Sequence, residues 1–266
     1  MQLGIDQLTV LGMGPLEHIR LAAALGCQGV SFTLGQRLAN PAGYPAWSLK
    51  DDAALRRAVR DELAACGIAL WLGEGIVVMP GVEAASRGAE MDAFAEIGAR
   101  GIVSSMMDCA FDWARDQFAT LCDMATARGL SYAVEFSPAK PLRDLQTALA
   151  LCDWIGAGRC GVVVDAMHHF RGGGTVAEVA TMDPARLAHV QLCDVPLAGA
   201  GDYMEEAMYR RLMPGNGELP LAALLTALPS GVTLGLEVPL LARIEAGEDH
   251  AGLIADMVSR ARGLMP

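Results

Sequence analysis

Short apolar runs alternate along the chain with longer stretches of helical periodicity. The runs are rich in β-branched residues and are four to eight residues long, as expected of buried strands. We predict eight strands, at residues 3–8, 28–34, 68–73, 101–106, 131–136, 160–165, 188–193 and 232–237. Helical stretches such as 51–67 and 112–129 lie between them, and several end in glycine. This alternation predicts parallel strands joined by crossover helices, and eight such units close a barrel.

The length of the chain agrees with one barrel. Its 266 residues lie near the roughly 250 typical of an eight-fold α/β barrel, although length alone also allows two domains of about 130. Because no Pro/Ser-rich linker or composition shift divides the sequence, we predict one (β/α)8 TIM barrel domain over residues 1–266. Two connections, 35–49 and 194–218, are long enough to form substrate walls or a lid on the active-site face.

Composition restricts the partners of such a barrel. The chain is 53% hydrophobic with a formal net charge of −11, and no Lys/Arg-rich run offsets that charge. A phosphate backbone would be repelled, so we expect no nucleic-acid partner. No run of 18 apolar residues or basic leader is present, so we expect a cytoplasmic protein without membrane contact. Seven cysteines without CxxC spacing are typical of reduced, buried thiols.

Candidate chemistry lies where the last four predicted strands end. Glu135, Asp165, Gln191 and Glu237 follow apolar residues there, at spacings of 30, 26 and 46 residues. Carboxyl ends of barrel strands share one face, so the four side chains are expected to converge. A buried carboxylate needs a partner, and three carboxylates with one amide oxygen suit a hard cation such as Mg²⁺ or Mn²⁺. The alternative for each acid is a helix N-cap or an ion pair.

Five motifs carry a resemblance to a known family. They are VEF at 134–136, DAMHH at 165–169, HVQLCD at 189–194, R-x-x-P-G-x-G at 211–217 and LEVP at 236–239. Together they resemble the xylose isomerase-like TIM barrel superfamily. That group includes sugar-phosphate isomerases, ketose 3-epimerases, inosose and dehydroshikimate dehydratases and, more distantly, endonuclease IV. The resemblance follows strand order over essentially the whole chain and is strongest from about residue 130.

The resemblance implies Glu135, Asp165, Gln191 and Glu237 as ligands of Mn²⁺, Mg²⁺ or Co²⁺. Epimerase-type members have histidine at the third position, where this chain has Gln191, as some dehydroshikimate dehydratases do. His189 is an alternative ligand, but it lies two residues earlier on the strand, about 6.6 Å deeper at ~3.3 Å per residue. We therefore expect His189 to support the site from below.

Two further residues are implied to contact substrate. In the D-x-x-H pattern that begins at Asp165, His168 is expected beside the substrate, as a hydrogen-bond partner or proton carrier, with His169 as its less favoured neighbour. A loop or capping histidine is the alternative. Arg211 resembles a family arginine that binds an anionic or hydroxylated end of the substrate, with Arg210 as the competing register.

These residues predict an enzyme that removes a proton next to a carbonyl. A cation would stabilise the resulting enediolate charge. The resemblance implies that Glu135 and Glu237, which would flank the substrate, pass the proton on and off its opposite faces. We expect an isomerase or epimerase acting on a small sugar, sugar phosphate or related hydroxy-carbonyl compound. A dehydratase of the dehydroshikimate or inosose type, with His168 as acid or base, is the alternative, and a non-catalytic metal- or ligand-binding barrel is the third. Endonuclease IV-like repair needs more histidines than the five present. The family also suggests a dimer or tetramer.

Overall fold

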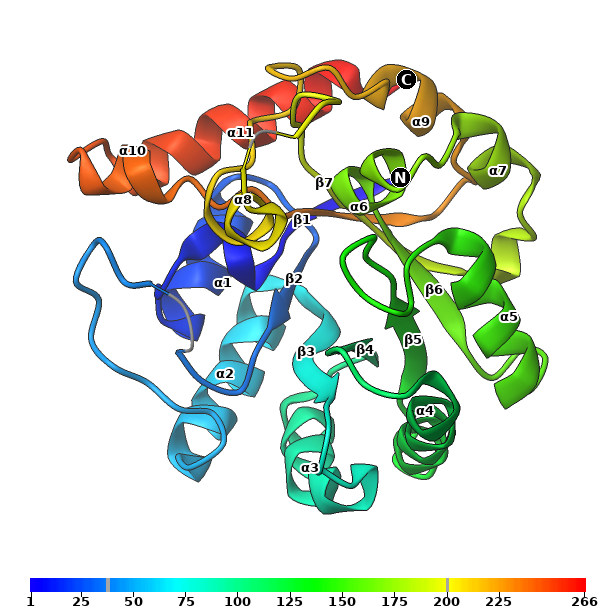
Figure 1. Ribbon diagram of the computed structural model, residues 1–266. Helices are drawn as coiled ribbons and strands as arrows, with labels where there is room; N and C mark the ends of the chain where they lie inside the picture. The colour runs from blue at the N-terminus through cyan, green and yellow to red at the C-terminus, as the bar shows by residue number, and fades with distance from the viewer. Residues whose placement is uncertain (37–38, 200) are drawn as a thin grey trace.

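Eight parallel strands close into a barrel in the computed structural model, which describes residues 1–36, 39–199 and 201–266 (Figure 1). The strands follow chain order around the barrel, and β8 pairs with β1. They are β1 (Gln2–Ile5), β2 (Gly29–Phe32), β3 (Ala69–Val78), β4 (Gly101–Met106), β5 (Ser131–Glu135), β6 (Gly161–Asp165), β7 (Leu187–Leu192) and β8 (Thr233–Leu236). The predicted (β/α)8 fold and all eight strand positions are confirmed.

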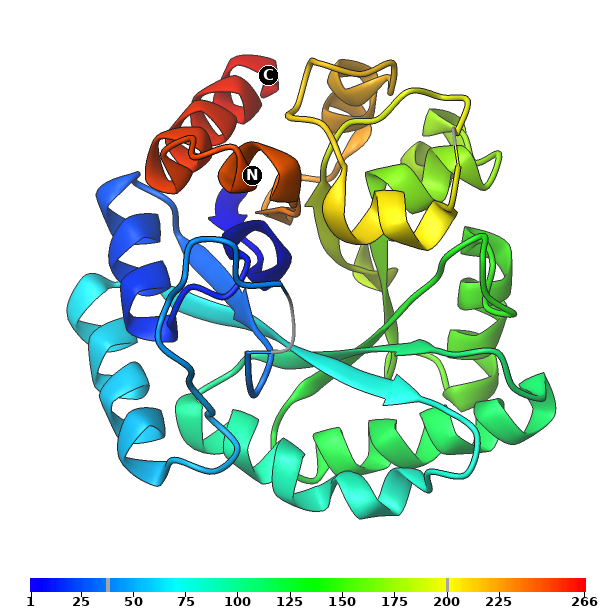
Figure 2. The same ribbon diagram turned by 60° about the vertical axis from the view of Figure 1, so that its left-hand side comes forward.

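Helices surround this barrel and are visible on its outside in both ribbon views (Figures 1 and 2). The α-helices are α1 (Pro15–Ala24), α2 (Ala53–Cys66), α3 (Gly88–Ile97), α4 (Phe111–Thr126), α5 (Leu145–Ile155), α6 (Ala166–Arg171), α7 (Val176–Thr181), α8 (Tyr203–Tyr209), α9 (Leu221–Ala227), α10 (Leu241–Glu245) and α11 (His250–Leu264). Short 3₁₀ helices are η1 (Gln7–Val10), η2 (Ala84–Arg87) and η3 (Pro184–Arg186). Among the described residues, no helix is long and apolar enough to cross a membrane.

Local sequence signals set where these helices begin and end. The Asp52 side chain accepts a hydrogen bond from the Leu55 amide at the start of α2, and α2 ends at Gly67 in a left-handed conformation with φ 66°. At α5, the side chains of Asp144 and Thr147 cap each other's backbone amides. Because these termini are satisfied locally, each short connection can return the chain directly to the next strand.

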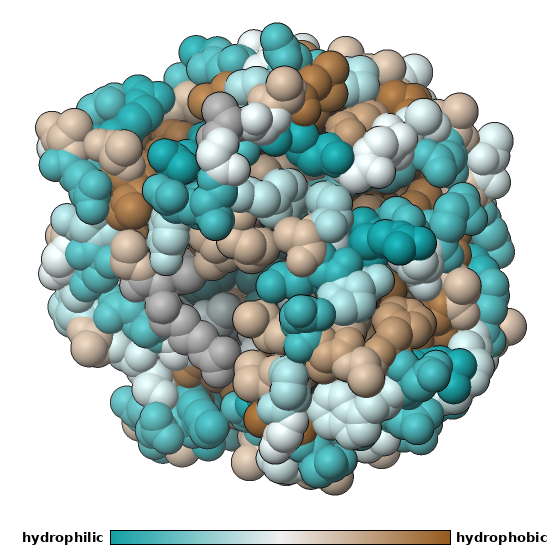
Figure 3. Space-filling view, viewed as in Figure 1, coloured by the Kyte–Doolittle hydropathy of each residue, from teal (hydrophilic) through white to brown (hydrophobic). Residues whose placement is uncertain are grey.

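The core has two layers. Most buried side chains lie between the strands and the outer helices, while a small second group fills the barrel itself, including Trp71, Val103 and Val163. Trp71 fits because Gly4 and Gly29 beside it lack a Cβ that would collide with its indole ring. On the face seen in Figure 3, polar and apolar side chains are interspersed.

The two long connections take different forms. Within residues 35–49, Gly35 and Ser48 form an antiparallel bridge, and Arg37 and Leu38 lie outside the described residues. The connection 194–218 contains α8, and Ala200 in it likewise lies outside the described residues. Met204, Ala207 and Met208 of α8 line the cavity at the barrel mouth. That this connection forms a substrate wall stays a prediction, and α8 is the part of it that would form the wall.

Candidate metal and substrate site

The four predicted ligands lie together at the carboxyl end of the barrel. Glu135 and Asp165 are the last residues of β5 and β6, and Glu237 directly follows β8. Gln191 lies one residue before the end of β7 and is in register with Asp165. A cavity of about 370 Å³ opens there, large enough for a small ligand.

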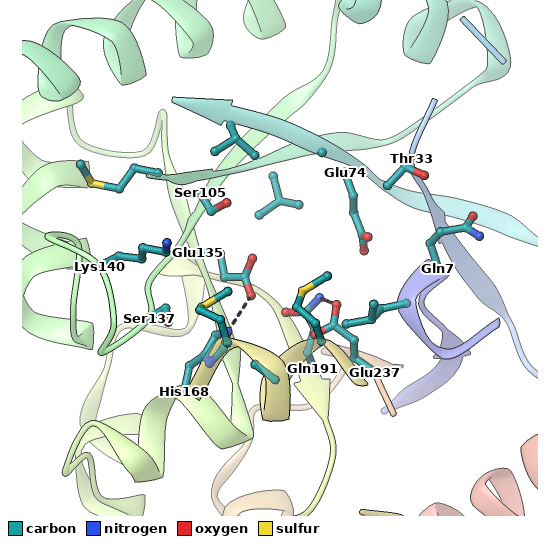
Figure 4. A pocket seen from close by; sticks show the side chains of 18 of the residues that line it. Gln7, Thr33, Glu74, Ser105, Glu135, Ser137, Lys140, His168, Gln191 and Glu237 are labelled. Atoms are coloured by element: carbon teal, nitrogen blue, oxygen red, sulfur yellow. Dashed lines mark hydrogen bonds and ion pairs between the residues drawn. The ribbon is translucent and has the colours of Figure 1, made fainter. Parts of the chain in front are cut away.

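A charged network joins three of the four. The Gln191 Nε2 amide donates to Glu237 Oε1 over 3.0 Å. The Arg211 guanidinium lies 2.5 Å from Asp165 Oδ2 and 2.9 Å from Glu237 Oε2. Glu135 stands apart from this network, and its closest charged contact is His168 Nε2, 3.6 Å from Glu135 Oε1 (Figure 4).

Asp165 also caps a helix. Its Oδ1 accepts a hydrogen bond from the His168 amide over 2.8 Å at the start of α6. The N-cap alternative therefore applies to this residue alongside any ligand role. Burial on its own would raise the pKa of Asp165, but the charges of Arg211 and His168 hold that pKa below its usual value.

The donor set fits a divalent cation. Gln191 is 2% exposed, and its Oε1 has no hydrogen-bond partner among the described residues. Burial and the charge of Asp165 raise the pKa of Glu135 to about 8, and burial raises the pKa of Glu237 well above its usual value despite Arg211. Several buried carboxyl groups thus share one guanidinium, and an unpaired amide oxygen faces them. An oxygen-seeking cation would supply the missing positive charge and the missing partner.

His168 enlarges the set of possible ligands. One ligand atom each from Glu135, Asp165 and His168 lies within 4.8 Å of the others. His168 Nδ1 lies 2.6 Å from the Tyr203 hydroxyl of α8, which fixes the orientation of the ring. Burial lowers the pKa of His168 to about 4, so the imidazole is neutral at pH 7 and can accept or donate a proton.

The competing histidine and arginine lie elsewhere. His169 Nε2 lies 2.9 Å from the Thr175 carbonyl oxygen, and His169 is not part of the cavity wall. Arg210 is exposed and pairs with Glu205, whereas Arg211 is 3% exposed and lines the cavity. Arg211 is therefore the arginine that faces the pocket.

The guanidinium of Arg211 is not presented freely to a substrate. Its Nε donates to the Ala207 carbonyl oxygen, and its Nη1 contacts Asp165 and Glu237. It lies between two predicted metal ligands and neutralises part of their charge.

His189 lies below the mouth, as expected. It is fully buried, with Nδ1 2.7 Å from Thr233 Oγ1 and Nε2 3.4 Å from Asp6 Oδ2. Its ring packs against Trp71, with 5.8 Å between ring centroids. These contacts place His189 inside the barrel rather than in the cavity wall.

Six polar residues of the cavity wall were not predicted from the sequence: Gln7, Thr33, Glu74, Ser105, Ser137 and Lys140. Glu74 follows the predicted end of the third strand at residue 73, but β3 continues to Val78. The sequence signal that could have identified it is an acid between two glycines inside an apolar run, because glycine in a strand often marks a bulge. Gln7 falls inside the predicted first strand, 3–8, and Lys140 lies in loop sequence, and neither has such a signal.

Comparison with known proteins identifies the family of this barrel. The model of one family, the xylose isomerase-like TIM barrel, matches residues 15–251. The chain belongs to this family. No curated protein matches the sequence.

Solved structures resemble this xylose isomerase-like barrel over nearly its whole length. An IOLI protein with a bound zinc atom is 16% identical, with a TM-score of 0.76 over 99% of this chain and 96% of that one. A D-psicose 3-epimerase from Clostridium cellulolyticum H10, solved with D-tagatose, is 13% identical, with a TM-score of 0.73 over 100% and 99%. At such identities the likeness shows a shared fold.

A third structure is a larger protein. A xylose isomerase-like TIM barrel/4-hydroxyphenylpyruvate dioxygenase fusion protein is 22% identical, with a TM-score of 0.73 over 90% of this chain. The present chain covers 38% of that fusion protein. The likeness therefore concerns its barrel fold.

Proposed function

We propose that this barrel is a divalent-cation-dependent isomerase or epimerase of a small hydroxy-carbonyl compound, such as a sugar or sugar phosphate. The observation that carries the proposal is the unpartnered Gln191 Oε1 beside the strand-end carboxylates of Glu135, Asp165 and Glu237. The zinc atom in the IOLI protein and the epimerase among the structural neighbours support it. Mn²⁺, Mg²⁺ and Co²⁺ are the proposed cations.

The roles of the side chains follow from their positions. When bound, a divalent cation supplies Lewis-acid stabilisation of the negative charge that develops on the substrate. Glu135, on β5, removes the proton next to the carbonyl, since it lies outside the Arg211 network that holds Asp165 and Glu237. Glu237, three strands away, returns a proton from the other side. His168 holds a substrate hydroxyl, and Arg211 fixes Asp165 and Glu237 and contacts the polar end of the substrate.

A specific asymmetry favours a dehydratase as the second candidate. Gln191 and Arg211 hold both oxygens of Glu237, whereas the described contacts of Glu135 involve only the neutral His168. If these contacts hold Glu237 too firmly for it to exchange protons, Glu135 and His168 remain as the groups that can carry a proton, and both lie on the same side of the substrate. Glu135 would then remove the proton and pass it through His168, 3.6 Å away, to a departing β-hydroxyl, so that water leaves.

Product analysis separates the two reactions. Hydroxy-ketones, inososes and 3-dehydroshikimate are incubated in D₂O with the Mn²⁺-loaded protein and followed by NMR. Solvent deuterium next to the carbonyl, with no loss of water, supports isomerisation, whereas loss of water supports dehydration. Cation binding without turnover of any compound would favour a metal-binding barrel that has no catalytic activity.

Mutations test the roles directly. Glu135→Gln or Glu237→Gln should abolish turnover and weaken Mn²⁺ binding by about 100-fold or more, since each removes a charged ligand. His168→Ala should slow turnover by about 100-fold and leave Mn²⁺ affinity nearly unchanged. Mn²⁺ titration by electron paramagnetic resonance measures the affinity. Normal cation binding and turnover in both glutamate variants would contradict the assignment.

A small-molecule substrate is the proposed partner. The homodimer or homotetramer that the family suggests stays a prediction, to be checked by light scattering of the purified protein.

A further inference from the structure

Glu74 is the acidic residue of the cavity wall that the proposed reaction does not use. It comes from β3, whereas the proposed ligands come from β5 to β8, and its side chain points into the cavity toward Gln191 and Glu237 (Figure 4). Its Oε1 is buried and has no hydrogen-bond partner among the described residues. A buried acceptor without a donor is costly, so its presence in a cavity indicates a ligand that supplies one.

The strand is distorted at the position of Glu74. Gly73 pairs with Ile102 and Ile76 pairs with Ser104, so between these two pairs β3 advances by three residues and β4 by two. The extra residue makes a β-bulge, and Gly75 within it has φ 83°, a conformation that other residues rarely adopt. Bulges beside active sites commonly redirect a side chain. Here the bulge places Glu74 in the mouth of the barrel.

A second unpartnered acceptor lies on the same side. Gln7, in η1 directly after β1, is 3% exposed, and its Oε1 also lacks a hydrogen-bond partner among the described residues. Both Gln7 and Glu74 line the cavity. The wall opposite carries potential donors instead, including Lys140 and His168. The β1–β3 wall therefore requires hydroxyl donors from a ligand.

We propose that Glu74 is a specificity-determining residue that accepts a hydrogen bond from a substrate hydroxyl remote from the reacting carbonyl. This inference rests on the proposed function, because the carbonyl and its neighbouring hydroxyl are assigned to the β5–β8 side. A compound that reaches both walls carries at least one further hydroxyl. The substrate is thus a polyhydroxylated carbonyl compound, and a simple hydroxy-ketone lacks the group that Glu74 recognises.

Two pairs of probes isolate that extra contact. Hydroxyacetone and D-erythrulose are open-chain ketones, and 2-hydroxycyclohexanone and scyllo-inosose are cyclic ones. Within each pair both compounds carry a carbonyl with a neighbouring hydroxyl. The second compound adds a hydroxyl on the other side of the carbonyl and at least one remote hydroxyl, and comparison of the Glu74 variants with the wild type isolates the contact made by Glu74. Calorimetric titration of the Mn²⁺-loaded protein gives the affinity ratio within each pair for the wild type, Glu74→Ala and Glu74→Gln.

We expect the affinity ratio within a pair to depend on Glu74. In at least one pair, the wild type should bind the polyhydroxylated compound about 10- to 100-fold more tightly, because a compound without the remote hydroxyl leaves the buried Glu74 carboxyl oxygen unpaired. Glu74→Ala should reduce the ratio to within about 3-fold of unity, and Glu74→Gln, which keeps one acceptor oxygen, should lie between. Glu17→Gln, at an exposed position of α1, is the matched control for loss of a carboxylate and should keep the wild-type ratio.

Mn²⁺ binding separates this inference from the proposed function. Glu74→Ala should keep wild-type Mn²⁺ affinity and a cooperative thermal transition, while Glu135→Gln loses the cation. Equal ratios in the wild type and Glu74→Ala, or no preference in the wild type, would overturn the inference alone. Loss of Mn²⁺ affinity in Glu74→Ala would make Glu74 a ligand and also overturn it. Failure of the wild type to bind Mn²⁺ would reject the proposed function itself.

Discussion

The two halves of the barrel mouth differ in how their polar side chains are satisfied. In the β5–β8 half, the side chains bind one another: Arg211 contacts Asp165 and Glu237, and Gln191 donates to Glu237. In the β1–β4 half, Oε1 of Gln7 and Oε1 of Glu74 have no hydrogen-bond partner among the described residues. Both halves line the same cavity.

The two halves of the mouth differ in what balances their buried polar groups. A half with several carboxylates must hold them together in the absence of a cation, since mutual repulsion of buried like charges is costly. Arg211 supplies that internal positive charge. The other half keeps two buried acceptor oxygens without a hydrogen-bond partner among the described residues, and we propose that a ligand supplies their donors. We therefore propose that the first half governs stability and cation binding and that the second governs which ligand is accepted.

Removing the buried positive charge of Arg211 is expected to have the largest effect on stability. Arg211→Met leaves Asp165 and Glu237 buried without their partner, and breaking a buried ion pair in this way costs about 3–5 kcal/mol of unfolding free energy. Mn²⁺ should restore part of that loss, because it neutralises the same carboxylates. Urea unfolding in EDTA and in Mn²⁺ measures both quantities.

The neighbouring arginine provides the control for this variant. Arg210 is exposed and pairs with Glu205 at the surface, so Arg210→Met should change the unfolding free energy by no more than about 0.5 kcal/mol. If Arg211→Met in EDTA is as stable as Arg210→Met, the guanidinium does not hold the ligand half together and serves substrate alone.

A buried histidine outside both halves provides a reference for pH dependence. Burial lowers the pKa of His18 from 6.5 to about 4, against the opposing hydrogen bond from its ring to the Ile5 carbonyl oxygen. Between these pH values the unfolded chain binds a proton that the folded protein excludes. The contribution of His18 is therefore complete above pH 6.5 and is lost as the pH falls toward 4, by about 3 kcal/mol.

A substitution isolates that contribution from the carboxylates of the mouth. His18→Gln cannot take up the proton, so its unfolding free energy should fall less steeply than that of the wild type between pH 6.5 and 4. Chemical denaturation at a series of pH values gives the two slopes. Parallel curves would mean that the pH dependence arises elsewhere, including in the mouth.

The same division between halves explains what the sequence could predict. Glu135, Asp165 and Glu237 were recognisable because each acid ends an apolar run, and the regular spacing of strands brings such ends to one face. The eight strands followed from the same pattern. The family match then supported the fold over residues 15–251.

Contacts between distant segments could not be predicted in this way. That Arg211 would lie between Asp165 and Glu237 depends on the path of the long connection that carries α8, which no local pattern specifies. Glu74 was missed because a bulge changes which face a strand residue occupies, and strand alternation alone cannot show a one-residue insertion. The half of the mouth built by regular strands was predictable, and the half built by irregularities was not.

The substitution with the smallest expected effect tests whether the β3 bulge directs the Glu74 side chain into the cavity. Gly75→Ala places a side chain at φ 83°, which should cost about 1–2 kcal/mol of unfolding free energy and favour relaxation of the bulge. Gly81, exposed at φ 75° beyond the end of β3, provides a matched substitution with similar backbone strain and open space around it. Both alanine variants should lose similar stability and keep Mn²⁺ affinity, but only Gly75→Ala should reduce the preference for scyllo-inosose over 2-hydroxycyclohexanone or for D-erythrulose over hydroxyacetone. An unchanged preference in Gly75→Ala would mean that Glu74 reaches the cavity without help from the bulge, and the irregularity of β3 would then need another explanation.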